Sequence, residues 1–356
     1  MKFLRIANPQ FEIELENDKT HNFIDSFHLH PIFLQLQYLS YLYGDESDFV
    51  LTTHHPEEGY LKRLANLGIS PPRGLLLDSC YLPDMPIDCW GYTPSLKKWA
   101  EVKNKTFTYP NLDVVKKVNR KDFSFLISPK LSGSKILTNL EEVKLWIEET
   151  PGTKVAKSVF GLSGRGHIFL TDDITDRAIS FFIKQWKKKL PIIGEPWVDR
   201  ILDFSTQWII HKDKTVDYIG PTICCNDAKG SYQKTIILPN ESIGENFDPF
   251  LKIHKDVCKT ILNYLASLDF YGNVGIDAMI YNEKGALKLH PVVEINARKT
   301  MGYVALMLQR KHFAENKLCL SYTNDRKEDN LLPNFATTNT GHSIQFSKVL
   351  RLEKLY

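Results

Sequence analysis

Apolar and polar positions form their clearest pattern between residues 272 and 302 of the chain. Residues 274–281 are rich in β-branched and apolar side chains, and residues 286–295 return to a similar composition. The four residues between these stretches end in Gly285, which tolerates the positive φ of a tight turn. The pattern predicts a β-hairpin whose two strands pair with each other.

Polar side chains interrupt both strands of this predicted hairpin. Side chains alternate faces along a strand, so Glu294 and Asn296 point to one face, and Asp277 can join them from the partner strand. Two carboxylates and an amide oxygen suit Mg²⁺, which keeps positions for water and substrate phosphates. Acidic residues near a hairpin are usually only solvated, but Glu294 lies inside an apolar run, where a charge needs a partner. We therefore favour a metal site.

The order Asp277, then Glu294-x-Asn296-x-Arg298, resembles the end of the catalytic core of ATP-grasp enzymes. That superfamily includes D-alanine–D-alanine ligase, biotin carboxylase and carbamoyl phosphate synthetase. The resemblance implies that Asp277, Glu294 and Asn296 hold Mg²⁺, or alternatively Mn²⁺, between the phosphates of ATP. It also implies that Arg298 faces the reacting acyl or phosphoryl group.

A second stretch with chemical potential lies upstream, where one predicted strand ends at Lys157 and another begins at His167. Glycines let the backbone approach a phosphate closely, and successive N–H groups form an anion-binding nest. The loop lacks the Gly-Lys-Ser/Thr of a Walker A motif, and strand–loop–strand differs from the strand–loop–helix of dinucleotide-binding motifs. It resembles the ATP-grasp phosphate loop, and an ordinary glycine-rich hairpin is the alternative. The residues assigned to ATP here are Lys157, Gly161, Ser163, Gly164, Arg165 and Gly166.

The resemblance assigns a further lysine, located just after the first domain, to the α-phosphate of ATP. This lysine often lies in an Asn-x-Lys setting, so we assign the role to Lys121, with Lys105 and Lys117 as alternatives. A basic run is otherwise usually a solvated helix face.

The resemblance also implies a segment that joins the two lobes of the core and carries the adenine. Glu195, Trp197 and Val198 match this segment, although any apolar connection between elements would have the same composition. Asp203 follows on a strongly predicted strand, and we expect it near the ribose or the metal.

Residues 1–100 alternate strand-like and helix-like runs, which predicts a small α/β domain. Residues 11–16 alternate apolar and acidic side chains and are interpreted as a half-exposed strand or arm, whereas residues 31–42 fit a buried helix or a strand pair. A helix is predicted to begin after the cap residue Thr93. Adjacent His54 and His55 would face opposite sides of a strand, which argues against a metal site there.

The expected architecture is α/β: an ATP-grasp fold preceded by a small α/β domain. We expect the small domain over residues 1–100, a small lobe with the phosphate loop over residues 101–190, and a large lobe with the metal site over residues 191–356. Helices are predicted over residues 172–186 and 248–268, the second from apolar residues at helical spacing.

Composition narrows the class of protein. Apolar residues make up 43% and charged residues 24% of the 356 residues, as in ordinary globular proteins. The net charge of +3 gives no field that would indicate nucleic acid. We expect no transmembrane helix, because no apolar run is long enough, and no signal peptide. The six cysteines form no CxxC pair, so we expect a reducing, cytoplasmic setting.

The expected reaction is the ATP-dependent activation of a carboxylate as an acyl phosphate, followed by attack of an amine or similar nucleophile, with release of ADP and phosphate. The expected partners are small molecules, such as an amino acid or a peptide, and a homodimer is left open. The alternative is a kinase-like or a non-catalytic, ATP-binding regulatory protein on the same fold.

Overall fold

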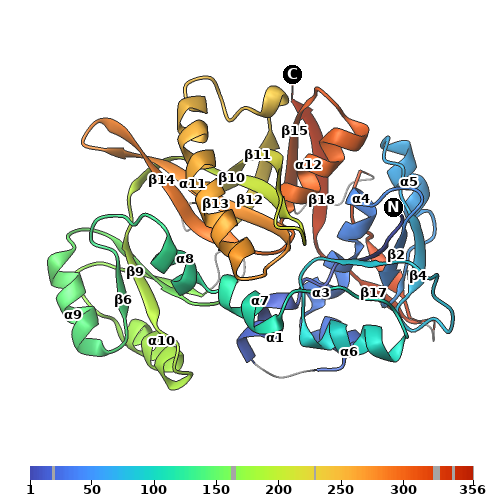
Figure 1. Cartoon of the computed structure of the whole chain (residues 1–356), viewed down its shortest axis with the longest axis horizontal. Coiled ribbons are helices and arrows are strands. Elements are labelled where there is room, and N and C mark those ends of the chain that lie inside the picture. The colour runs from blue at the N-terminus through green and yellow to red at the C-terminus, as the bar shows by residue number, and fades with distance from the viewer. Residues whose placement is uncertain (18–20, 162–165, 228–229, 324–328, 339–340, 356) are drawn as a thin grey trace.

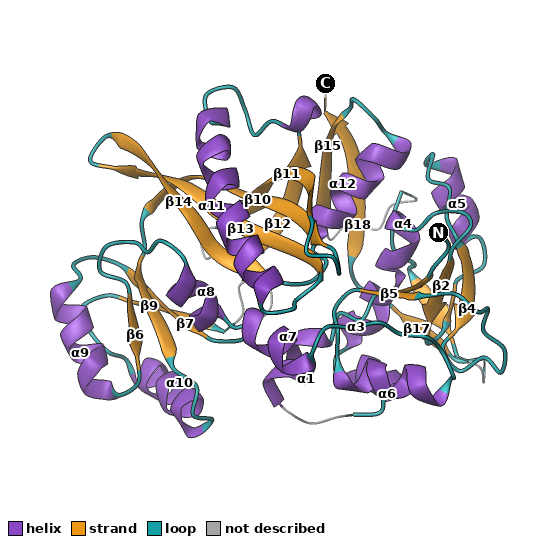
Figure 2. Cartoon of the chain, in the orientation of Figure 1, coloured by secondary structure: helices purple, strands orange, loops and turns teal. Residues whose placement is uncertain are grey.

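The computed structural model describes residues 1–17, 21–161, 166–227, 230–323, 329–338 and 341–355. Strands and helices are mixed along this part of the chain, which confirms the α/β class, and the strands form four sheets (Figures 1 and 2). No helix in the described ranges is both long and apolar enough to cross a membrane.

The first sheet is parallel and has the order β4-β2-β1-β5. Its strands are β1 (Leu4–Ile6), β2 (Phe49–Thr52), β4 (Arg73–Leu76) and β5 (Ile87–Cys89). The accompanying helices are α1 (Phe11–Asn17), α2 (Phe23–Ser26), η1 (Phe27–Leu29), α3 (Pro31–Leu36), η2 (Gln37–Leu39), α4 (Ser40–Tyr43), α5 (Tyr60–Asn66) and α6 (Pro94–Val102). The Thr93 hydroxyl accepts a hydrogen bond from the Leu96 N–H at 3.2 Å, which confirms the predicted cap of α6.

Two interpretations of this region are decided by the structure. The strand or arm expected over residues 11–16 is wrong, because these residues form helix α1. Phe11 and Leu15 are both buried and lie four positions apart, so they share one face of the helix. In so short a segment, alternating apolar residues therefore fit a helix as well as a strand. Residues 31–42 follow the helical alternative.

A second sheet, of order β6-β9-β7-β8, is antiparallel. Its strands are β6 (Lys135–Leu137), β7 (Lys154–Ser158), β8 (His167–Leu170) and β9 (Ile192–Pro196). Helices α9 (Leu140–Glu149) and α10 (Asp176–Lys187) accompany this sheet, and their buried Trp146 and Phe182 belong to its apolar core (Figure 1). The segment expected to connect the two lobes therefore contains a strand of its own, β9.

The largest sheet is antiparallel and has the order β14-β13-β10-β11-β12-β15-β18. Its strands are β10 (Asp199–Ile210), β11 (Val216–Asn226), β12 (Tyr232–Ile237), β13 (Gly272–Glu283), β14 (Ala286–Asn296), β15 (Lys317–Thr323) and β18 (Val349–Leu355). The predicted hairpin is confirmed as β13 and β14, which extend beyond the predicted limits.

Two helices cover opposite faces of this sheet, because they contact adjacent residues of β10. On one face, His254 of α11 (Asp248–Ser267) hydrogen-bonds the buried Thr206 hydroxyl at 2.7 Å. On the other face, α12 (Met301–His312) follows Thr300, whose hydroxyl donates to the Gln207 side chain at 2.8 Å. Successive residues of a strand face opposite sides, so α12 and the hairpin carboxylates share the face of Gln207.

The remaining elements connect distant parts of the chain. Helices α7 (Leu112–Val118) and α8 (Lys121–Ile127) lie between the first two sheets along the chain, and η3 (Pro239–Glu241) precedes α11. A small sheet joins β3 (His55–Pro56) to β16 (Phe335–Thr337) and β17 (Ser343–Gln345). The Tyr60 hydroxyl donates to the Leu331 carbonyl at 2.9 Å beside this sheet. Residues of the first sheet and its helices therefore share one apolar core with residues 331–350.

Candidate functional site

The hairpin β13–β14 brings the three expected metal ligands together. Asp277 pairs directly with Glu294 across the two strands, and Gly275 pairs with Asn296. The Asn296 side chain donates a hydrogen bond from Nδ2 to Asp277 Oδ2 at 3.1 Å. Two carboxylates and an amide oxygen thus lie on one face of the sheet, as strand alternation predicts.

The two carboxylates have opposite electrostatic settings. Burial raises the pKa of Asp277 to about 6, and the nearby charge of Glu294 adds to this shift. Burial also acts to raise the pKa of Glu294, but the charges of Lys121 and Arg298 outweigh it and hold that pKa below the ordinary value. The negative charge of Glu294 is therefore balanced by cations within the site, whereas the charge of Asp277 is not.

Lys121 supplies most of the compensation for Glu294. Its Nζ donates to Glu294 Oε1 at 2.6 Å and to the Gly161 carbonyl at 3.1 Å. Burial acts to lower the pKa of Lys121, but the charges of Glu294 and Glu12 raise it above its ordinary value. Lys121 is therefore a fully charged ammonium that bridges strand β14 and the segment after β7.

Local hydrogen bonds fix the position of Lys121. It is the first residue of α8, and its N–H donates to the Val159 carbonyl at 3.0 Å. Asn119 Oδ1 accepts from the Ala297 N–H at 3.0 Å, which fastens the start of α8 to the end of β14.

The other two candidate lysines have different partners. Lys105 donates to the Leu82 carbonyl at 2.7 Å, and the Lys117 ammonium lies 5.6 Å from the centre of the Phe123 ring. Of the three lysines considered from the sequence, the structure brings Lys121 to the hairpin carboxylates.

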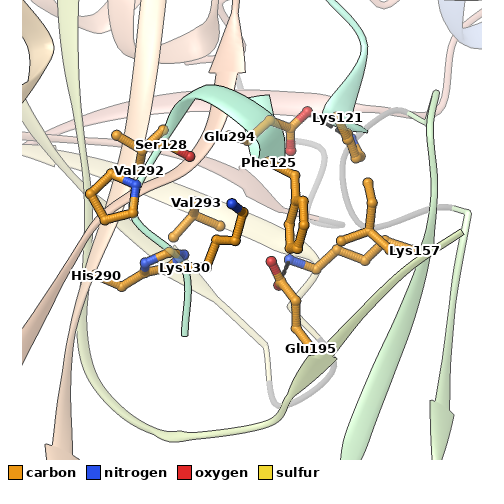
Figure 3. Close-up of a pocket in the computed structure, with 12 residues that line it drawn as sticks. Lys121, Phe125, Ser128, Lys130, Lys157, Glu195, His290, Val292, Val293 and Glu294 are labelled. Atoms are coloured by element: carbon orange, nitrogen blue, oxygen red, sulfur yellow. Dashed lines mark hydrogen bonds and ion pairs between the residues drawn. The ribbon is translucent and has the colours of Figure 1, made fainter. Parts of the chain in front are cut away.

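A narrow pocket, partly open to solvent, adjoins Lys121 and Glu294 (Figure 3). At its other end the Lys157 ammonium forms an ion pair with the Glu195 carboxylate. Four residues expected at the site from the sequence therefore share one pocket. Its lining consists of Lys121, Phe125, Ser128, Pro129, Lys130, Lys157, Ile193, Glu195, His290, Val292, Val293 and Glu294.

Sequence reasoning missed several residues of this pocket. Lys130 projects into it, with its ammonium 5.1 Å from the centre of the Phe125 ring, and no recognisable motif surrounds either residue (Figure 3). His290 lies on β14 opposite Met279, and burial lowers its pKa to about 4, so the imidazole is neutral at pH 7. The sequence could have indicated His290, because it lies on the predicted strand four residues before Glu294.

Arg298 connects the hairpin to the first domain. Its Nε donates to Glu12 Oε1 at 2.9 Å, and Nη2 donates to the same oxygen and to Asn296 Oδ1 at 3.0 Å. Glu12 is buried in the first turn of α1. The sequence did not indicate this contact, because Glu12 and Arg298 are 286 positions apart and residues 11–16 were expected to form a strand.

The expected adenine and ribose residues occupy a separate group. The Trp197 ring packs against Phe169, with ring centres 4.7 Å apart, and the Arg200 guanidinium lies 5.1 Å from the Trp197 ring centre. Asp203 forms an ion pair with Arg200 at 2.8 Å, and its other carboxylate oxygen accepts a hydrogen bond from Asn226 Nδ2 at 2.9 Å. Trp197, Val198 and Asp203 are absent from the described lining of the pocket that contains Glu195.

The glycine-rich stretch is only partly described. Ser163, Gly164 and Arg165 lie outside the described residues. Gly166 has a φ of +82°, and its carbonyl accepts from the Ser158 N–H at 2.7 Å. A side chain at residue 166 would collide with the Ser158 hydroxyl, so this position requires glycine for both conformation and space.

The donor set fits a magnesium ion that acts together with a phosphate ligand. Among the described residues, no group of three or more His, Cys, Asp or Glu side chains could hold a metal by itself. Mg²⁺ is commonly bound by one or two carboxylates, with water and substrate phosphates completing its shell. Asp277, Glu294 and Asn296 match that chemistry, with Lys121 and Lys157 nearby to offset phosphate charge.

No family model and no curated protein matches the sequence. Several solved structures match the fold. The biotin carboxylase domain of 2-oxoglutarate carboxylase from Hydrogenobacter thermophilus, solved as a dimer with MgADP, ADP and bicarbonate, has a TM-score of 0.55 at 12% identity, over 99% of this chain and 85% of that chain. Biotin carboxylase from Campylobacter jejuni has a TM-score of 0.52 at 12% identity, over 86% of this chain and 87% of that chain.

A third match is carboxyaminoimidazole ribonucleotide synthase from Aspergillus clavatus, solved with ATP. Its TM-score is 0.51 at 12% identity, over 86% of this chain and 93% of that chain. These proteins are ATP-grasp enzymes. At such low identity the likeness establishes the fold, so this chain has the ATP-grasp fold with an α/β domain before it.

Proposed function

Because the chain has the ATP-grasp fold, we propose that it is an Mg²⁺-dependent ligase that forms ADP. In this proposal ATP phosphorylates a carboxylate, and an amine or similar nucleophile attacks the resulting acyl phosphate with release of phosphate. The observation that carries the proposal is the convergence of Asp277, Glu294 and Asn296 beside Lys121 and Arg298. Such a site favours phosphoryl transfer, which depends on positioning and charge neutralisation.

Each side chain has a separate task in the proposal. Asp277, Glu294 and Asn296 would hold Mg²⁺, which supplies charge neutralisation for the phosphates when bound. Lys121 and Lys157 would contact the nucleotide phosphates as point charges. Arg298 would orient the reacting carboxylate or acyl phosphate with its planar fork of N–H donors.

The nucleotide would extend from these phosphate contacts past Glu195 in the pocket toward the separate group of Trp197, Val198 and Asp203. Gly161 to Gly166 would complete the contact with the phosphates. The solved relatives support the general reaction, since one of them was crystallised with MgADP and bicarbonate. The carboxylate and amine of this chain are part of the proposal, and amino acids or peptides are the first candidates.

The decisive experiment follows the products of ATP. The purified chain is incubated with ATP and Mg²⁺ and with a panel of carboxylic acids and amines, first identified by thermal shift with a non-hydrolysable ATP analogue. We expect ADP and phosphate to accumulate only when both an acid and a nucleophile are present.

Other products would contradict the ligase. AMP with pyrophosphate would overturn an acyl-phosphate mechanism. ADP with a stable phosphorylated product and no free phosphate would indicate a kinase. Tight ATP binding without turnover across the panel would favour a regulatory protein.

A further inference from the structure

The two pocket lysines are each paired with a carboxylate, but the two pairs differ in one respect. Lys121 is paired with Glu294, which is an expected metal ligand. Lys157 is paired with Glu195, which is not. Figure 3 shows these pairs at separate places along the pocket. The ammonium of Lys121 therefore lies where a cation bound to Glu294 would compete with it.

Glu294 is poorly suited to hold two cations at once. Mg²⁺ binds carboxylate oxygens at about 2.0–2.1 Å, while the Lys121 ammonium already lies 2.6 Å from Glu294 Oε1. The side chains of Lys121 and Glu294 are only 15% and 26% exposed, so solvent screens the repulsion between an ammonium and a metal only in part. A metal ion that binds Glu294 through Oε1, or through both carboxylate oxygens, would therefore displace the ammonium.

The displaced lysine needs a new anion. A lysine has a flexible stem and no acceptor atoms, so its buried ammonium is stable only beside a carboxylate, a carbonyl or a phosphate. In the proposed function, the metal arrives with a nucleotide phosphate, which would supply that anion. Metal binding without a nucleotide would leave the ammonium with the Gly161 carbonyl as its remaining described hydrogen-bond partner, near the charge of Glu12, which is already paired with Arg298.

We propose that Lys121 acts as a stand-in cation for the metal, and that the metal–nucleotide complex enters by exchange: Glu294 passes from Lys121 to the metal while Lys121 passes to a phosphate. Lys121 is then the residue that makes the site select the metal–nucleotide complex over free metal. This inference rests on the proposed function and adds a specificity-determining role to it.

The test measures Mn²⁺ binding, as the loss of the electron paramagnetic resonance signal of free Mn²⁺, with and without ADP. Lys121→Met keeps most of the aliphatic stem and removes the charge. An opposite charge in close contact shifts a carboxylate's affinity for a proton by about one to three pK units, so Lys121→Met should bind Mn²⁺ without ADP at least about tenfold more tightly than the parent protein. The enhancement of Mn²⁺ affinity by ADP should shrink in the same variant.

Two further variants distinguish the effect of direct contact with Glu294 from the effect of any positive charge in the pocket. Lys157→Met removes a pocket charge that does not contact Glu294, and it should change the ADP-free affinity for Mn²⁺ by less than about threefold, as expected for a more distant and partly screened charge. Lys121→Arg keeps the charge and should remain close to the parent protein. It also serves as the folding control for position 121, alongside circular dichroism of every variant.

The possible outcomes are distinguishable. Equal or weaker ADP-free Mn²⁺ binding by Lys121→Met, or an equal gain in Lys157→Met, overturns the exchange while leaving the proposed ligase intact. Failure of the parent protein to bind Mn²⁺ even with ADP would instead contradict the proposed function. If Lys121→Met does not fold, Lys121→Gln makes the same comparison, and its unchanged ADP-free affinity would equally refute the inference.

Discussion

Neutralising the two paired carboxylates should change stability in opposite directions. Asp277 and Glu294 face each other across β13 and β14, yet burial raises the pKa of Asp277 from an ordinary value of 3.8 to about 6. The lysine and arginine beside Glu294 instead hold its pKa below the ordinary value. Asp277→Asn should therefore stabilise the metal-free protein at pH 8, and Glu294→Gln should destabilise it.

The magnitude for Asp277 follows from linkage. A folded-state pKa above the unfolded value means that the ionised carboxylate opposes folding, and its protonation supports folding at low pH. A rise of about 2 pK units corresponds to an upper limit of about 3 kcal/mol at pH 8, falling to about 1 kcal/mol at pH 4.5. Asp277 is half-buried, and solvent screening should reduce the gain from Asp277→Asn to about 1–2 kcal/mol at pH 8.

The ionised carboxylate of Glu294 has the opposite effect on stability, because its pKa is lowered on folding. A depressed folded-state pKa contributes stability that is present above the unfolded pKa and is lost as the pH falls through the folded pKa. Glu294→Gln also leaves the Lys121 ammonium without its charged partner, at a cost of about 1–3 kcal/mol near neutral pH. The cost should decline in acid, where Glu294 of the parent protein is itself protonated.

The assay is urea unfolding in the presence of a chelator, followed by both tryptophan fluorescence and circular dichroism at pH 4.5 and pH 8. Coincident transitions are required before free energies are compared. Destabilisation by Asp277→Asn at pH 8, or a gain that does not depend on pH, would refute the electrostatic account of this pair. Mn²⁺ binding with ADP should be weakened in both variants, which separates stability from function.

Further expectations concern nucleotide binding, chemistry and the link to the first domain. Lys157→Ala should weaken ATP binding in calorimetry with little loss of stability, and an unchanged affinity would remove Lys157 from the nucleotide site. Arg298→Lys should keep nucleotide and metal binding but slow turnover with a substrate found by the product assay, because an ammonium cannot reproduce the bidentate fork; normal turnover would exclude Arg298 from the reaction centre. Glu12→Gln should cost about 1–3 kcal/mol of stability, because it weakens a buried charge-assisted pair. Glu16 lies on the same helix as Glu12 and forms a more exposed pair with Lys188, so Glu16→Gln should cost about 0–1 kcal/mol, and equal costs would contradict the role given to burial.

The parts of the site that the sequence predicts are those encoded by local spacing. Glu294 and Asn296 are two residues apart on one strand, and a short turn places Asp277 on the neighbouring strand. Strand alternation and hairpin pairing then bring the three side chains to one face without further information.

The residues that could not be predicted depend on tertiary packing. Glu12 reaches Arg298 only because α1 packs against the core near the hairpin, and the alternating pattern of that segment fits a strand equally well. Lys130 enters the pocket from the chain that follows α8, where no periodic pattern fixes its direction. For such residues the sequence gives the chemistry of the side chain but not its neighbours.

The small sheet that joins β3 to β16 and β17 has a consequence for biosynthesis. The Tyr60 hydroxyl donates a hydrogen bond to the Leu331 carbonyl, which is synthesised 271 residues later. The Gln35 side chain likewise donates to the Lys348 carbonyl. At ribosomal rates of about 5–20 residues per second, that separation lasts about 14–54 s. The segment around Gln35 and Tyr60 therefore leaves the ribosome with an apolar core that stays incomplete until residues 331–350 are synthesised.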